Sequence, residues 1–382
     1  MKRNPSQKRA IAHLSGPMMV LAGPGSGKTS VTVERIAYMT KECGISPASI
    51  LVVTFSRAAA KEMKERFLKF TGQEHSPVTF GTFHGVFYAI LKQAYGFTAA
   101  NILSEEEKNS ILKELTLELA GELAEEGDFT GELAKEISVV KGNRISLEHY
   151  YSSCCPDEVF RQIYQGYRKA CTARRKLDFD DMLLYCYELF QQRQDILQAW
   201  QNKFRYILVD EFQDISPLQY ELICQWNRYG KELFVIGDPD QSIYGFRGSD
   251  PACFSRFLED EPGAEVISLH KNYRSSGTIT EGAAAVISNN PGEKRSLVSM
   301  AGPGSRMRIV KASGKRSEGI FTAREINRMV GGIDMLDAQE QGAAEGRTVR
   351  SFSDIAVLCR TNRQAEAMEE YLKKEGIPYT VT

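Results

Sequence analysis

A chain of 382 residues is long enough to bury the cores of two or three domains, and its 42% hydrophobic and 25% charged residues are typical of a soluble globular protein. The longest apolar runs, residues 50–55 and 206–209, are too short to cross a bilayer, and no secretory segment follows the basic N-terminus, so we expect a cytoplasmic protein without a membrane partner. The net charge of −1 does not indicate a nucleic-acid partner, and the eight cysteines and five histidines lack metal-ligand spacing.

The first hundred residues alternate short strand patterns with helical patterns. Strands are predicted at 18–22, 50–55 and 78–80, with helices from a glycine-rich turn to residue 39 and over 56–70. Such alternation is typical of a parallel sheet covered by helices.

The next segment, residues 104–189, is almost wholly helical. Ser104 and Glu107 form a plausible capping box, and Ile111, Leu115 and Leu119 repeat on one helical face. Gly142 and Asn143 predict the end of a helix, and strand patterns return at 206–209, 233–236 and 265–269. We therefore predict a helical domain inserted into an α/β domain.

The remaining residues predict the beginning of another α/β domain. Its strands are expected at 307–311 and 355–359, its helix at 318–330, a loop at 331–350, and a further strand start at 378–381. The predicted organisation is a first motor domain at 1–98 and 191–271, a helical insertion at 99–190, and an incomplete second motor domain at 272–382.

A phosphate-binding loop is predicted at residues 22–29 (AGPGSGKT), between a strand and a helix. Glycines in such a loop let backbone N–H groups surround phosphates at a helix N-terminus. Lys28 would contact the β- and γ-phosphates and the Thr29 hydroxyl would ligate Mg²⁺. The nucleotide-binding set also includes Gly23, Gly25, Ser26, Gly27 and Ser30.

An apolar strand ends in two acids, Asp210 and Glu211. Asp210 is expected to hold Mg²⁺ through water, and Glu211 to orient or deprotonate the attacking water. The long stretch of chain between Thr29 and Asp210 is explained by the predicted helical insertion. The acids at 178, 180 and 181 are expected to be structural rather than catalytic.

Basic residues cluster on two segments. Most charge runs are solvated helix faces, so these clusters alone do not establish a phosphate contact. The clusters are Lys61, Lys64, Arg66 and Lys69, and Arg168, Lys169, Arg174, Arg175 and Lys176.

The order and spacing of seven motifs resemble the superfamily 1A DNA helicases of the UvrD/Rep/PcrA group. Besides the phosphate-binding loop, the motifs are residues 4–7 (NPSQ), 54–60 (TFSRAAA), 81–84 (GTFH), 210–214 (DEFQD), 237–244 (GDPDQSIY) and 272–275 (NYRS). The resemblance implies a RecA-like P-loop NTPase core that uses ATP and Mg²⁺, with an inserted helical domain and the start of a second RecA-like domain.

The resemblance also implies roles around the nucleotide. Gln7 would read the adenine edge, while Arg35 and Tyr273 would sandwich the base. Gln241 would sense the γ-phosphate and Arg274 would stabilise its transition-state charge.

Single-stranded DNA, or a junction of single and double strands, is the implied partner. Phe55, Tyr244 and Phe246 would stack on bases, with Thr82 and His84 completing the contact. The sequence departs from the family at Gly245-Phe246, where arginine and tryptophan are usual, which would weaken single-strand affinity or coupling.

The implied function is ATP-driven movement along single-stranded DNA, 3′ to 5′, in repair or replication. The family's later motifs are not in these 382 residues, so we expect a truncated motor, a piece of a longer protein, that hydrolyses ATP slowly. Three alternatives remain open: the helicase subunit of a helicase–nuclease, a nucleotide-switched binding module that does not translocate, and RNA in place of DNA.

Overall fold

Two compact units, residues 1–305 and 306–382, make up the chain. The computed structural model describes residues 3–121, 128–227, 232–290, 295–331 and 350–381. None of the helices in these ranges is both long and apolar enough to span a bilayer. The expected boundary at residues 271 and 272 remains a prediction.

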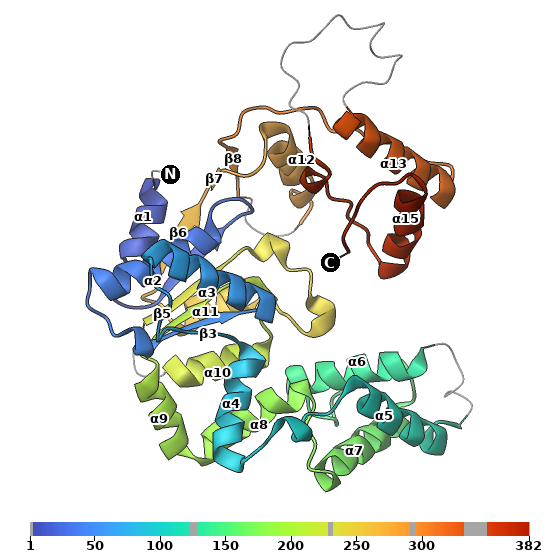
Figure 1. Cartoon of the computed structure of the whole chain (residues 1–382). Helices are drawn as coiled ribbons and strands as arrows, with labels where there is room; N and C mark the ends of the chain where they lie inside the picture. Colours follow the sequence, from blue (N-terminus) through green and yellow to red (C-terminus); the bar gives the residue numbers. More distant parts are fainter. Residues whose placement is uncertain (1–2, 122–127, 228–231, 291–294, 332–349, 382) are drawn as a thin grey trace, which may run out of the picture. The chain divides into compact units, whose positions relative to one another are not determined.

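A six-stranded parallel sheet forms the centre of the first unit (Figure 1). Its order is β3-β2-β4-β5-β1-β6. The strands are β1 (Met18–Ala22), β2 (Ile50–Thr54), β3 (Thr79–Thr82), β4 (Tyr206–Val209), β5 (Glu232–Gly237) and β6 (Glu265–Leu269). Because all six run in one direction, the loops after β1, β4 and β5 leave the same edge of the sheet as neighbours.

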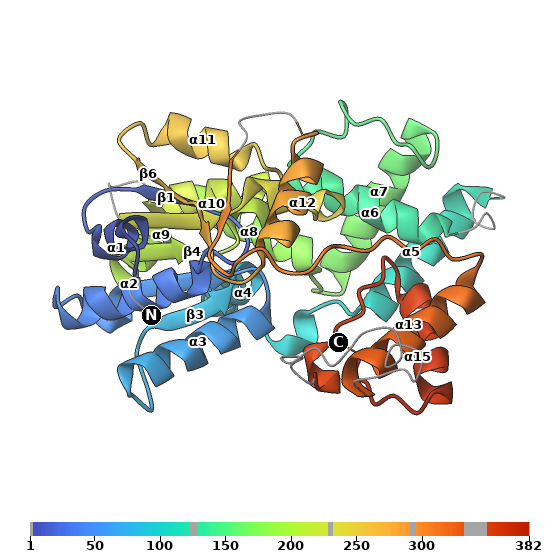
Figure 2. The ribbon, with the colours of Figure 1, turned by 90° about the horizontal axis from the view of Figure 1, so that it is seen from above.

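Helices cover both faces of this sheet (Figures 1 and 2). Along β1 the side chains alternate, so that Met18 and Val20 enter one core and Met19 the other. The first core includes α1 (Pro5–Ala12), α2 (Lys28–Lys41) and α3 (Arg57–Thr71). The second includes α4 (Phe83–Tyr95), α8 (Phe179–Gln192), α9 (Gln194–Lys203), α10 (Pro217–Asn227) and α11 (Cys253–Asp260).

The segment between α4 and β4 is helical, and its first part has a core of its own, whereas the bounds of the insertion at 99–190 stay a prediction. That core joins α5 (Glu105–Leu119), α6 (Phe129–Gly142) and α7 (Asp157–Ala173). The capping box of Ser104 and Glu107 is present, with both reciprocal hydrogen bonds. After β6 the chain forms β7 (Lys271–Asn272), α12 (Gly277–Ile287) and β8 (Val298–Ser299), with β7 and β8 paired in parallel.

The second unit is built on α13 (Lys315–Gly331) and α15 (Asn362–Lys374). Ala323, Ile326, Leu372 and Ile377 form its core. The predicted helix is confirmed, but the predicted strands at 307–311, 355–359 and 378–381 are wrong, because these segments form no ladder. A strand needs a neighbour to bond its backbone, and no described segment of this unit supplies one.

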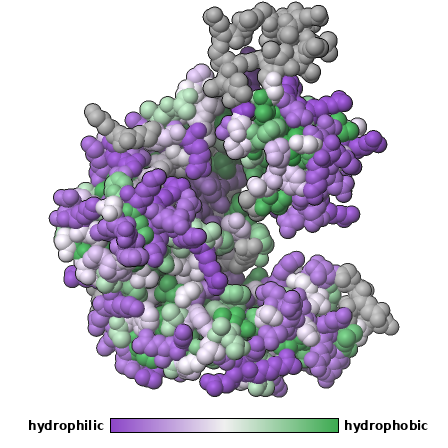
Figure 3. Space-filling model, in the orientation of Figure 1, coloured by the Kyte–Doolittle hydropathy of each residue, from purple (hydrophilic) through white to green (hydrophobic). Residues whose placement is uncertain are grey.

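Apolar side chains of the unpaired segments are consequently exposed. Ile309 is 100% and Leu358 is 95% exposed, and apolar residues are visible on this unit at the upper right of Figure 3. Most of the predicted loop at 331–350 lies outside the described residues.

Candidate nucleotide and single-strand sites

The loop after β1 has the backbone of a phosphate-binding loop. Gly25 and Gly27 have φ angles of +66° and +90°, a region that glycine enters without strain. The Ser26 hydroxyl donates to the Gly23 carbonyl at 2.7 Å, which fixes the turn. Because α2 begins at Lys28, Thr29 and Ser30 lie in its first turn, where backbone N–H groups are free to bind anions.

A chain of polar contacts joins this loop to the ends of β4 and β5. The Lys28 ammonium lies 2.9 Å from the Glu211 carboxylate, which also accepts a 2.8 Å hydrogen bond from the Gln213 amide. The Gln213 side-chain oxygen accepts from the backbone N–H of Asp238 at 2.9 Å. Glu211 has a φ of +49°, an uncommon conformation for a residue with a side chain. The sequence motif contained Gln213 but gave no sign of this bridging role.

The Asp210 carboxyl is buried directly after β4, beside Glu211. Burial and the neighbouring Glu211 charge raise the pKa of its carboxyl to about 7. One carboxylate oxygen is buried without a hydrogen-bond partner, as expected of a group whose ligand is a cation or its water. The described residues contain no cluster of three or more His, Cys, Asp or Glu side chains arranged around a metal. The Asp210 carboxylate therefore fits Mg²⁺ that takes its remaining oxygen ligands from phosphates and water, and the contribution of Thr29 stays a prediction.

Gln241 lies at the same edge, after β5. Its amide donates a 2.6 Å hydrogen bond to Asp238, whose other carboxylate oxygen lies 2.9 Å from the Arg295 guanidinium. No sequence pattern indicated that Arg295 would meet Asp238. The charge on Asp238 is thus compensated, and Gln241 is held directly after β5.

The segment after β7 packs directly on the phosphate loop. The backbone N–H of Tyr273 donates to the Gly25 carbonyl at 2.9 Å. A β-carbon built on Gly25 would lie 2.6 Å from the Asn272 side-chain oxygen and 2.7 Å from Cβ of Arg274, so glycine is needed for this close approach. The Arg274 side chain is exposed and forms no ion pair with another described residue. Its guanidinium is therefore available to a phosphate.

Three predicted stacking aromatics come together beside this edge. The Phe55 and Tyr244 rings are stacked with centroids 4.9 Å apart, and Phe246 lies 5.9 Å from Tyr244. Phe55 follows β2, whereas Tyr244 and Phe246 follow β5. Phe246 is 63% exposed, so it offers a ring face to a base.

Thr82 pairs with Thr54, the residue before Phe55, and His84 follows it in the first turn of α4. The Thr82 hydroxyl accepts from the Gly85 N–H at 3.2 Å and caps α4. The His84 ring meets Phe179 edge-on at 5.6 Å. Burial lowers the pKa of His84 to about 4, so its imidazole is neutral at pH 7 and would contact a nucleic acid as a neutral hydrogen-bonding group.

Comparisons with known proteins agree with this arrangement. The UvrD/REP helicase N-terminal domain matches residues 3–262, and the UvrD-like helicase C-terminal domain matches residues 267–382. The chain belongs to the UvrD/Rep helicase family. It is 33% identical to the ATP-dependent DNA helicase PcrA of Staphylococcus aureus over 99% of this chain and 50% of that protein. The identity to the PcrA of Staphylococcus epidermidis is 32% over the same shares. The chain thus spans about half the length of these curated relatives.

The nucleotide-binding role predicted for Arg35 of this UvrD/Rep chain is wrong. Arg35 is 1% exposed and donates to the backbone carbonyls of Ala10 and His13, where α1 ends. Its guanidinium lies 4.6 Å from the centre of the Phe234 ring. Burial lowers its pKa to about 10, and the group stays charged. Arg35 therefore holds α1 against the sheet and presents no face to an adenine.

Gln7 and Tyr273 both contact the phosphate loop, Gln7 at Ser26 and Tyr273 at Gly25. The Gln7 amide donates to the Ser26 carbonyl at 3.0 Å, and its oxygen accepts from the Asn4 N–H at 3.1 Å. Asn4 also donates to the Tyr273 hydroxyl at 3.0 Å, a contact that sequence reasoning missed. Gln7 is 2% exposed, so these contacts brace the start of α1 against the phosphate loop, and the reading of an adenine edge stays a prediction.

Proposed function

We propose that the full-length protein is an ATP- and Mg²⁺-dependent DNA helicase that moves 3′ to 5′ along single-stranded DNA, in repair or replication. We infer a cytoplasmic site of action from this substrate. One observation carries the proposal, a path of polar contacts from Lys28 of the phosphate loop to Ser242, at the start of the loop that bears Tyr244 and Phe246. Lys28 pairs with Glu211, Gln213 donates to Glu211, and the Ser242 hydroxyl donates to the Gln213 carbonyl at 3.1 Å. Ser242 stands two residues before Tyr244.

The residues of the cleft have complementary tasks in hydrolysis. Lys28 would bind the β- and γ-phosphates, which requires its pairing with Glu211 to break. The released Glu211 carboxylate would then orient the attacking water and accept its proton. Arg274 would compensate charge on the γ-phosphate. Mg²⁺ held through Asp210 and Thr29 would neutralise phosphate oxygens.

Nucleotide state would reach the DNA through the same contacts. When Glu211 turns from Lys28 to water, the hydrogen bond from Gln213 must follow it. Gln213 contacts both the Asp238 backbone and Ser242, so the loop bearing Tyr244 and Phe246 would shift with it. Such a shift alters the stacking of bases, which is the event that a translocating motor needs.

A translocation assay tests this proposal with the full-length protein. Oligo-dT strands of increasing length would carry a fluorophore at the 5′ or the 3′ end. We expect the time of the ATP-dependent signal to lengthen with strand length for the 5′ label alone. Length-independent signals at both ends would contradict translocation and favour the nucleotide-switched binding module. Equal activity on oligo-U would show that RNA also serves as a track.

A further inference from the structure

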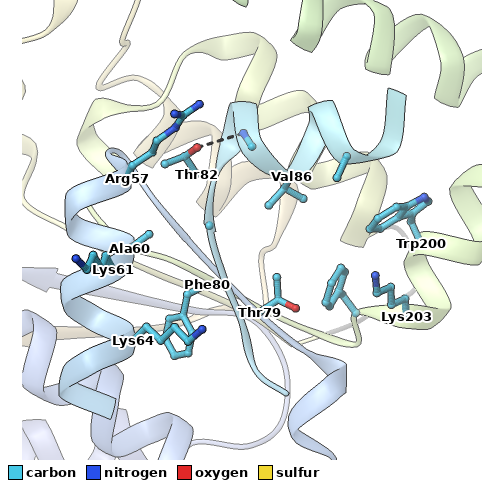
Figure 4. A pocket seen from close by; sticks show the side chains of 14 residues that line it. Arg57, Ala60, Lys61, Lys64, Thr79, Phe80, Thr82, Val86, Trp200 and Lys203 are labelled. Atoms are coloured by element: carbon cyan, nitrogen blue, oxygen red, sulfur yellow. Dashed lines mark hydrogen bonds between the residues drawn. The ribbon is translucent and has the colours of Figure 1, made fainter. Parts of the chain in front are cut away.

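We propose that the groove beside β3 binds an extended, acidic segment of a partner protein whose apolar side chains alternate with carboxylates. The groove lies between α3, β3, α4 and α9 and has a volume of about 500 Å³. Figure 4 shows Arg57, Lys61 and Lys64 along α3 on one side of β3, with Trp200 and Lys203 on the other. We call this feature the β3 groove.

The rim of the β3 groove is positively charged. Arg57, Lys61, Lys64 and Lys203 line it, and its lining contains no aspartate or glutamate. Within the described chain, Arg57, Lys64 and Lys203 form no ion pair, and Lys61 meets Glu65 only at 3.9 Å. The Lys203 ammonium is held 4.4 Å from the centre of the Trp200 ring. This concentration of cations on a chain of net charge −1 is complementary to an acidic ligand.

The floor of the β3 groove is apolar and already packed. Val86 and Trp200 are each 8% exposed and Phe204 is 1% exposed. Trp200 also packs edge-on against Trp226 at 6.2 Å. The buried rings of Trp200 and Phe204 cannot offer a face to a base, in contrast to Phe246, and the partly accessible ring of Phe80 is packed 5.7 Å from the Phe67 ring. The floor instead suits small aliphatic side chains, so the observations favour a peptide over a nucleic acid.

β3 itself supplies the backbone partner. It is the outermost strand of the sheet, and its outer edge is paired with no other described strand. All four of its residues are partly accessible, whereas β2 is buried throughout. An exposed edge strand can accept a further strand through main-chain hydrogen bonds, while alternate side chains enter the groove. With its apolar side chains against Val86 and Trp200, the added strand would turn its carboxylates toward the cations of α3.

Binding of a defined peptide to this chain tests the proposal. The probe is a fluorescein-labelled peptide of about ten residues that alternates aspartate with valine, followed by fluorescence anisotropy. We expect the double variant Lys64→Glu and Lys203→Glu to weaken binding about tenfold or more, because attraction becomes repulsion at two sites. The matched control, Lys113→Glu and Lys169→Glu, makes the same charge change on exposed residues of the helical insertion and should bind as the parent does.

A second variant leaves every lysine in place. Ala89→Glu adds a carboxylate at an exposed position in the lining and should also weaken binding. Strand addition further predicts slower amide hydrogen exchange at residues 79–82 when the peptide is bound. The proposal is overturned if the aspartate peptide does not bind the parent chain, or if the two groove variants bind it as the control does. Displacement of the peptide by oligo-dT, with equal loss of oligo-dT binding in both groove variants, would assign the groove to DNA instead.

Discussion

At the scale of single residues, the ion pair of Lys28 and Glu211 is the feature that ATP must change. The Lys28 ammonium and the Glu211 carboxylate satisfy one another at 2.9 Å. A γ-phosphate offers Lys28 a more highly charged partner, and it frees the carboxylate beside the site of attack. ATP binding by Lys28 and the activation of Glu211 as the general base are thereby linked.

Glu211→Gln should separate binding from hydrolysis. We expect ATP hydrolysis by the full-length protein to fall about 10²- to 10⁴-fold, because the proton acceptor is lost. ATP affinity, measured on this chain by calorimetry, should hold or rise because Lys28 no longer has a competing carboxylate. Glu259→Gln, an exposed position on α11, serves as the control and should change neither quantity. An equal loss of binding and hydrolysis in Glu211→Gln would contradict these roles.

His84 should make stability depend on pH. Its folded pKa of about 4 lies below the ordinary value of 6.5, so the unfolded chain takes up a proton first as pH falls. The stabilisation is complete above pH 6.5 and is lost between pH 6.5 and 4. Full loss would be about 2 kcal/mol, below what the shift alone implies because the side chain is partly accessible. Urea unfolding of His84→Gln across this range should show a flatter pH profile, and an unchanged profile would refute the assignment.

Residue types in local motifs were predictable, whereas long-range partners were not. Lys28, Thr29, Asp210 and Glu211 follow strands in short patterns, and the parallel sheet brings these strand ends together. Arg35 was misassigned because one sequence position does not reveal whether a helix face meets solvent or α1. No local pattern marks Arg295 as the partner of Asp238, since their contact depends on how distant segments return.

At the scale of elements, a buried charge cluster fastens the helical insertion to the sheet domain. The Lys141 ammonium of α6 lies 2.8 Å from Asp178 and 2.7 Å from Asp181, at the start of α8. The Tyr167 hydroxyl of α7 donates to Asp178 at 2.7 Å. Lys141 therefore holds the pKa of Asp178 well below its usual range despite burial. These acids are structural, as their place in the sequence suggested.

Lys141→Met should destabilise the protein by about 3–5 kcal/mol, because two buried carboxylates lose their cation. Lys135→Met, an exposed position on the same helix, should change stability by less than about 0.5 kcal/mol. Urea unfolding followed by circular dichroism measures both variants. Equal midpoints would show that the cluster does not fasten the insertion.

Helices and the central strands could be predicted because their periodicity is local and long enough to read. Local periodicity alone could not decide whether residues 307–311 and 355–359 form strands. Their apolar patterns suit a strand, but a ladder also requires a neighbouring strand, and sequence pattern does not report whether one is present. The exposed side chains of Ile309 and Leu358 are the result.

At the scale of the whole molecule, the proposed motor requires coupling between the nucleotide cleft and the aromatic cluster. Ser242→Ala removes the hydroxyl that donates to Gln213 while leaving every proposed ATP ligand in place. In the full-length protein, we expect basal ATP hydrolysis to stay the same and its stimulation by oligo-dT to fall about fivefold, the equivalent of one hydrogen bond. Ser255→Ala, an exposed position on α11, is the control. A loss of basal hydrolysis in Ser242→Ala would instead place Ser242 in the chemical step.

The most direct test of the central claim is ATP hydrolysis by the full-length protein with and without oligo-dT, beside its Lys28→Ala variant. We predict that oligo-dT strongly stimulates the full-length protein and that Lys28→Ala abolishes hydrolysis under both conditions. If the full-length protein binds ATP but its hydrolysis does not respond to oligo-dT, the coupling proposed here is contradicted, and the nucleotide-switched binding module becomes the better account.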